Sequence, residues 1–85
     1  MKDYVIAFSS FYKAAYAQEK LQDQRVRSSL KKTPPKLLKS CGYALYVRTN
    51  QIQQVIDILQ KSNINDSGVY EIQEQNNQID YIRVS

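Results

Sequence analysis

Apolar residues along this chain of 85 residues recur at two spacings, one typical of strands and one typical of helices. Residues 4–8 are apolar and mostly β-branched or aromatic, and they predict a buried first strand. A helix is expected to begin after Ser9 and Ser10, whose hydroxyls can cap it, and to end near residue 22 or 23. Its inner face is predicted to contain Phe11, Ala14, Ala15, Ala17 and Leu21.

The middle of the chain predicts two further strands joined by a proline-containing segment. Residues 25–32 alternate weakly and are highly charged, as expected of an edge strand that is protected against pairing with another chain. Pro34 and Pro35 end this strand because proline cannot donate to a sheet ladder. Residues 36–40 are short enough to be one helical turn or a loop, and the apolar run over residues 43–48 predicts the next strand.

A second helix is the strongest periodic signal in the sequence. Its apolar positions follow the i, i+3, i+4, i+7 rule and are Ile52, Val55, Ile56 and Leu59. We expect Thr49 and Asn50 to cap this helix, with Gln53 as the capping-box partner of Asn50. The helix should end near residue 62 or 63, after which Ile64 is expected to pack back onto the sheet.

The C-terminal part predicts a hairpin that completes the fold. Residues 69–74 and 79–84 are expected to be strands, joined by a tight turn at Asn76 and Asn77, which tolerate positive φ. The order is then β-α-β-β-α-β with a last β added, which indicates an α+β, ferredoxin-like split-βαβ sandwich. Both helices would cover one face of an antiparallel sheet whose first and third strands are central. A chain of this length predicts one domain, residues 1–85.

Composition excludes several kinds of chemistry. The chain has no histidine and a single cysteine, so it offers no zinc-type ligand set and no histidine-assisted nucleophile. We expect neither a metal nor another cofactor. One cysteine cannot form an intramolecular disulfide, and no run approaches the ~20 apolar residues of a membrane-spanning helix. These features favour a cytoplasmic protein without a membrane partner.

Positive charge is concentrated in the middle of the chain. The net charge is +4, and between residues 20 and 48 eight basic residues stand against one acidic residue, Asp23. The basic residues are Lys20, Arg25, Arg27, Lys31, Lys32, Lys36, Lys39 and Arg48. The C-terminal third is mildly acidic. Such an asymmetry of charge affects which partners the protein can attract, and it does not predict the fold.

One stretch, from Thr33 to Leu45, resembles the central signature of DUF3343, a family of small bacterial domains regarded as selenium/sulfur carrier-like. The resemblance extends over about Asp3 to Glu74. The residues that carry it are Pro34, Ser40, Cys41, Gly42, Ala44, Leu45 and the strand-ending Arg48. The chain departs from the family pattern at residues 35–39, where the family often has an arginine and several serines.

The resemblance implies a carrier in which Cys41 accepts a sulfur or selenium atom as a persulfide or perselenide. Gly42 would let a donor approach closely. Lys36, Lys39 and Arg48 would be binding residues that favour the thiolate, because nearby cations lower the pKa of a thiol. The implied partner is a donor protein such as a cysteine desulfurase, and the protein would be a carrier or binding protein rather than a turnover enzyme. The residues alone leave a second interpretation open, in which Cys41 is a small buried apolar side chain.

Two functions without covalent chemistry also remain open. The sheet face or the basic segment could bind a small ligand or nucleic-acid phosphates, with Tyr4, Tyr43 or Tyr46 stacking on bases. The sequence has no RNA-binding signature, and a solvated edge strand explains the charge more simply, so nucleic acid is the less expected partner. The other function is an interaction domain or homodimer that pairs through a strand edge or the terminal hairpin.

Overall fold

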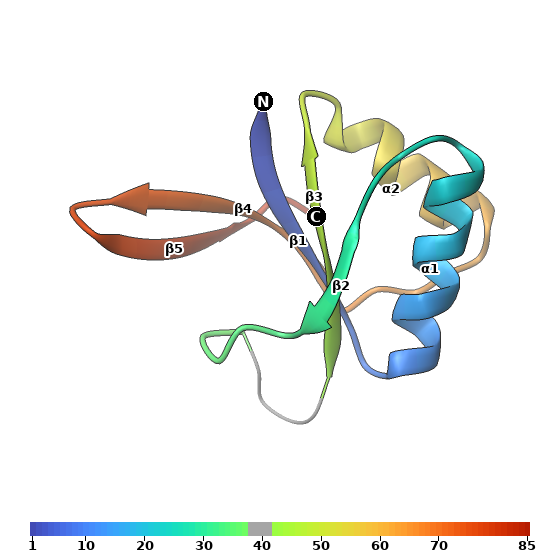
Figure 1. Ribbon diagram of the computed structural model, residues 1–85, viewed down its shortest axis with the longest axis horizontal. Coiled ribbons are helices and arrows are strands. Elements are labelled where there is room, and N and C mark those ends of the chain that lie inside the picture. Colours follow the sequence, from blue (N-terminus) through green and yellow to red (C-terminus); the bar gives the residue numbers. More distant parts are fainter. Residues whose placement is uncertain (38–41) are drawn as a thin grey trace.

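The computed structural model describes residues 1–37 and 42–85, which form two helices and five strands (Figure 1). In chain order these elements are β1 (Lys2–Phe8), α1 (Phe11–Asp23), β2 (Ser29–Lys32), β3 (Tyr43–Thr49), α2 (Ile52–Lys61), β4 (Gly68–Gln75) and β5 (Gln78–Arg83). No helix of the described residues is long and apolar enough to cross a membrane.

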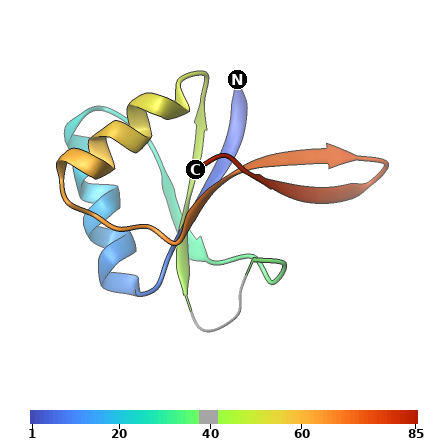
Figure 2. The same cartoon turned by 180° about the vertical axis from the view of Figure 1, so that it is seen from behind.

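The five strands form one antiparallel sheet in the order β2-β3-β1-β4-β5. This is the ferredoxin-like split-βαβ arrangement with β5 added beside β4, so the predicted fold is confirmed. Both helices cover the same face of the sheet, and the β4–β5 hairpin projects away from them (Figures 1 and 2). One face of the sheet is therefore without a helical cover.

The hydrophobic core lies between the helices and the sheet. It joins Ile6 and Phe8 of β1 to the inner faces of both helices. The buried helix residues are Ala14, Ala17 and Leu21 in α1 and Val55, Ile56 and Leu59 in α2, as the apolar spacing predicts. Ile64 is also buried, as expected. Phe11 is an exception, because it is 47% exposed and places its ring edge-on against Tyr43 instead of inside the core.

Hydrogen bonds define both ends of α1. The Ser10 hydroxyl accepts from the Lys13 N–H at 3.2 Å, which confirms the predicted cap. At the other end Arg25 adopts a left-handed conformation with φ of 62°, and the Val26 and Arg25 N–H groups donate to the carbonyls of Leu21 and Gln22. This is a Schellman motif. The prediction of a strand from residue 25 is wrong, because this left-handed turn delays β2 until Ser29.

The start of α2 also differs from its prediction. Its N-cap is Gln51, which makes no side-chain capping bond, and the Thr49 hydroxyl accepts from the Gln51 N–H at 3.0 Å. Gln53 donates to Asp57 one turn further on instead of closing a capping box. The predicted capping box is therefore wrong, since the N-cap is Gln51, one position after Asn50. The hydroxyl that accepts a hydrogen bond at this point is that of Thr49, the last residue of β3.

The β4–β5 hairpin turns at Asn76 and Asn77, whose φ values of 51° and 63° confirm the predicted tight turn. The first part of β4, from Gly68 to Ile72, pairs with β1. Residues 70–75 pair with β5, so the tip of the hairpin extends beyond Ile72, where the pairing of β4 with β1 stops.

The left-handed Arg25 generates a stability prediction. A side chain with a Cβ costs about 1–2 kcal/mol in this conformation, whereas glycine adopts it freely. We expect Arg25→Gly to raise the free energy of unfolding by about 0.5–1 kcal/mol, measured by urea denaturation. Arg25→Ala keeps the Cβ while it removes the charge, so it should stay near the parent. An equal gain in both variants would assign the effect to charge instead.

Candidate functional site

The loop between β2 and β3 carries the sequence that predicts a carrier. It is closed at its base by the Thr33 N–H, which donates to the Gly42 carbonyl at 3.2 Å, next to the register pair Lys32 and Tyr43. The Leu37 N–H donates to the Pro34 carbonyl at 2.9 Å and forms a turn. Of the predicted site residues, Cys41 and Lys39 lie outside the described residues.

A mainly apolar cavity of ≈ 630 Å³ opens beside this loop. Its lining includes Gly42, the residue directly after Cys41 in the sequence. The other lining residues are Lys32, Thr33, Pro34, Pro35, Tyr43, Tyr46 and Tyr81. Four segments, the end of β2, the proline turn, β3 and β5, therefore build one cavity.

Lys36 connects the proline turn to the terminal hairpin. Its ammonium donates to the Ile79 carbonyl at 2.5 Å and lies 3.9 Å from the Asp80 carboxylate. Both partners are in β5, one or two residues before Tyr81 of the cavity wall. An exposed pair of this kind contributes little to stability. The contact does show that the proline turn and the hairpin lie next to each other beside the cavity.

Tyrosines cover the sheet face that has no helices. Val5 of β1 pairs with Tyr46 of β3 on one side and with Tyr70 of β4 on the other. Tyr81 of β5 pairs with Ile72, two residues after Tyr70, so all three tyrosines lie on this face. Val5 is fully buried below them. The Lys31 ammonium lies 5.2 Å from the centre of the Tyr46 ring, and the Arg83 guanidinium lies 5.8 Å from that of Tyr70. We call this surface the tyrosine face.

Gly68 allows the Tyr70 ring to lie flat on this face. A Cβ at Gly68 would stand 2.7 Å from the Tyr70 hydroxyl oxygen. Gly68 also has a φ of 137°, which side chains with a Cβ rarely adopt. The isolated glycine in the sequence therefore marks a close approach of a ring to the backbone, which sequence reading did not assign.

Arg48 lies at the far end of β3 from the loop, and strand register places Tyr4 and Tyr43 on the helix-covered face. Arg48 stands six positions after Gly42, at the opposite end of β3, and its Nε lies 3.1 Å from the Asp3 carboxylate. Tyr4 is 5% exposed and cannot stack on a base. Tyr43 lines the cavity but packs its ring against Phe11. Tyr46 is the one of the three that strand register places on the tyrosine face.

Sequence reading missed Thr33, Tyr70 and Tyr81 as site residues. Tyr81 stands 39 positions after Gly42 and reaches the cavity only through the pairing of β5 with β4. The alternation of β5 predicts that its odd positions share one face, but it does not show which face of the sheet that is.

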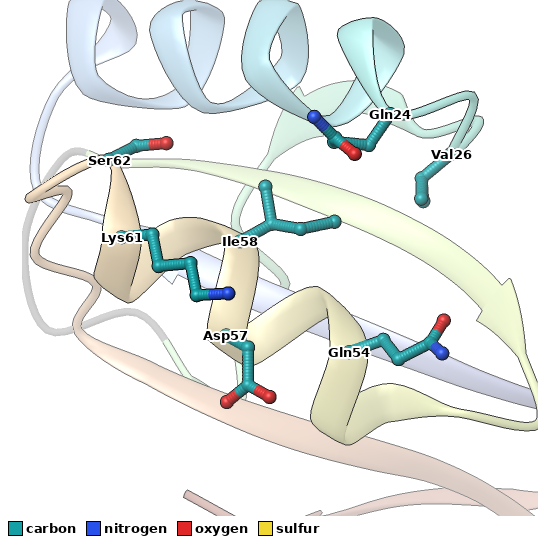
Figure 3. A pocket seen from close by; sticks show the side chains of 7 residues that line it. All are labelled: Gln24, Val26, Gln54, Asp57, Ile58, Lys61 and Ser62. Carbon is teal, nitrogen blue, oxygen red and sulfur yellow. The ribbon is translucent and has the colours of Figure 1, made fainter.

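A second cavity, of ≈ 470 Å³, lies between the end of α1 and α2 (Figure 3). Gln24 and Ile58 extend into the space between the two helices, while Asp57 and Lys61 lie on the outer side of α2 (Figure 3). This cavity belongs to the helical layer, so the sheet separates it from the tyrosine face.

The chain belongs to the family described as "Putative Se/S carrier protein-like", which it matches over residues 3–71. A search of curated proteins finds no match. Among solved structures, the crystal structure of a functionally unknown protein from Pediococcus pentosaceus ATCC 25745 is similar, with a TM-score of 0.51 and 19% sequence identity. The alignment covers 98% of this chain and 81% of that one. At this identity the likeness supports the fold alone.

The position of Tyr46 generates a prediction about alkaline pH. Burial, and secondarily the neighbouring Tyr81 hydroxyl, raises the pKa of Tyr46 above its ordinary value of 10.0. The contribution of this group to stability is thus complete below about pH 10 and is lost as pH rises through the raised pKa, because the unfolded chain releases the proton first. Tyr46→Phe should show a smaller loss of unfolding free energy above about pH 10 than the parent.

Tyr12→Phe is the matched control, since Tyr12 is 83% exposed on α1. It should lose stability with pH as the parent does. If Tyr46→Phe and Tyr12→Phe have identical alkaline profiles, the raised pKa of Tyr46 is contradicted.

Proposed function

We propose that this protein carries sulfur or selenium, with Cys41 as the atom acceptor. The observation that supports this most is the family match, which spans residues 3–71 and therefore includes the Ser40-Cys41-Gly42 sequence. The second support is the cavity lined by Gly42, because a carrier must receive its donor close to the acceptor thiol. Cys41 is the only cysteine of the chain, so the protein has no resolving thiol, which suits a carrier better than a dithiol oxidoreductase.

The transfer step balances without an external oxidant when the donor is itself a persulfide. The Cys41 thiolate attacks the terminal sulfur of a persulfide on a donor such as a cysteine desulfurase. A sulfur–sulfur bond forms to Cys41, and the sulfur–sulfur bond of the donor breaks. Its electron pair remains on the donor cysteine, which leaves as a thiolate. The donor is reduced to a thiol while Cys41 is oxidised to a persulfide, and a perselenide donor transfers selenium in the same way.

The surroundings of the loop favour such a thiolate. Lys36 and Lys39 flank the sequence before Cys41, and cations lower the pKa of a thiol. The Lys36 ammonium also pairs with the Asp80 carboxylate, so it should lower the pKa of the thiol less than an unpaired lysine would. Arg48 belongs to the proposal only as a contact for the donor protein, because it pairs with Asp3 at the other end of β3. A reduced thiol of this kind is maintained in the cytoplasm, where we place the protein.

The carrier proposal predicts a mass increase on Cys41. Incubation with a cysteine desulfurase and cysteine should add one sulfur atom to the intact protein, and dithiothreitol should remove it. With selenocysteine as the substrate, one selenium atom should be added. Cys41→Ser should take up neither atom, because it has no thiol. Intact-mass spectrometry measures all of these outcomes.

Alkylation supplies the control that separates an inert thiol from an inaccessible one. Cys41 should react with iodoacetamide in the native protein, and Lys36→Met should slow this reaction near neutral pH by raising the thiol pKa. Lys61→Met, on α2, should leave the rate unchanged. A thiol that alkylates readily but accepts neither sulfur nor selenium from a persulfide donor would rule out the carrier function.

A further inference from the structure

Tyr46 lies between two cavities of different character. On one side is the apolar cavity of ≈ 630 Å³ with Tyr81, Pro34 and Thr33 in its lining. On the other side is a cavity of ≈ 380 Å³ lined by Arg27, Ser28, Ser29 and Arg48, with Gln22 of α1. Tyr46 lines both. An aromatic surface on one side of the ring is thus joined to a cationic, hydroxyl-rich surface on the other.

The lining of each cavity also includes a residue whose hydroxyl is buried and has no partner among the described residues. Thr33 is only 6% exposed, and its Oγ1 has no hydrogen-bond partner among the described residues. The Ser28 Oγ is in the same condition. Buried polar atoms are nearly always hydrogen-bonded, because leaving one unpaired is costly. These two atoms belong to lining residues of the two cavities, which is consistent with a ligand that supplies hydrogen-bonding groups at both places.

The charge of this surface shows what kind of ligand it suits. Arg27, Lys31, Lys32 and Arg48 lie in or beside the two cavities. Asp3 pairs with Arg48, but an arginine has five N–H donors, so this ion pair uses only part of its capacity. The ligand should therefore carry negative charge toward Arg27 and Arg48. It should also carry flat apolar groups toward Tyr46 and Tyr81.

We propose that the tyrosine face binds single-stranded nucleic acid along β2 and β3. One base stacks on Tyr46 in the apolar cavity and bonds to the Thr33 hydroxyl, while phosphates lie on Arg27 and Arg48. Lys32 and Ser29, which line the two cavities, stand three residues apart in β2, roughly 10 Å. A chain that repeats base and phosphate satisfies both cavities at once. Stacking on aromatic side chains combined with cationic backbone contacts is the general mode of single-strand binding.

Binding is tested by fluorescence anisotropy with short labelled oligo(U) and oligo(dT) at about 50 mM salt, where phosphate contacts are strongest. Tyr46→Ala should weaken binding at least about fivefold, the loss of one stacked base. Tyr46→Leu, which keeps the bulk, should weaken it similarly, which guards against loss of folding as the cause. Tyr12→Ala, at an 83% exposed position on α1, should bind as the parent does.

Charge reversal tests the phosphate contacts. Arg27→Glu should weaken binding and reduce the slope of log affinity against log salt by about 0.7 or more, the contribution of one lost phosphate contact on a single strand. Lys13→Glu makes the same change in charge on the exposed side of α1 and should leave the slope unaltered.

Thr33→Val separates a role of the Thr33 hydroxyl in binding from a role in stability alone. Removal of an unpaired buried hydroxyl at constant shape should raise the melting temperature. The same change should reduce the preference among oligo(U), oligo(A) and oligo(C), because the hydroxyl no longer bonds to a base. Thr33→Ser should retain the preference.

Three results would overturn the proposal. The first is the absence of oligonucleotide binding at low salt by the full chain. The second is that heparin or polyglutamate binds as tightly as the oligonucleotides do and that Tyr46→Leu weakens neither kind of binding, which would indicate an acidic protein partner. The third is equal binding by uridine monophosphate at the same molar concentration, which would indicate a small-molecule site. Cys41→Ser should bind as the parent does, so this test is independent of sulfur transfer.

Discussion

Every side chain from Tyr4 to Phe8 is buried, although successive side chains of a strand point to opposite faces of a sheet. A strand that is apolar on both faces needs a neighbour on each edge and a cover on each face. β3 and β4 supply the edges, and α1 and α2 cover one face. The other face cannot be covered by a helix, because both helices follow crossovers on the same side (Figures 1 and 2). It is covered by tyrosines instead.

This second cover explains why the loop of Cys41 and the terminal hairpin belong to one site. Tyr46, Tyr70 and Tyr81 come from three strands and lie over the fully buried Val5. Lys36 extends from the proline turn to β5 above them. A cover made of separate side chains packs less continuously than a helix does, and the cavities beside Tyr46 are the result. The loop that leads to Cys41 and the proposed nucleic-acid surface therefore meet at one cavity, whose lining includes Thr33, Gly42 and Tyr46.

Several structural features were within reach of the sequence. The stripe of Val55, Ile56 and Leu59, the Ser10 cap and the Asn76–Asn77 turn all depend on neighbours within one or two turns of chain. The errors also have local causes. Arg25 occupies a left-handed position where glycine is usual, so no sequence signal marked the turn that delays β2 until Ser29. At the entry to α2, the Thr49 hydroxyl rather than the Asn50 side chain accepts a hydrogen bond, from the Gln51 N–H.

The sequence by itself determined the order of elements, the ferredoxin-like class and the candidate acceptor Cys41, because periodicity, turn residues and motifs are properties of contiguous chain. Tertiary structure alone decided which tyrosines share a face, that Lys36 reaches β5, and that Arg48 lies far from the loop. It also buried the Thr33 hydroxyl with no hydrogen-bond partner in residues 1–37 and 42–85. These features arise where strands distant in sequence pair in register, and a register difference of one residue would turn each of those side chains to the other face.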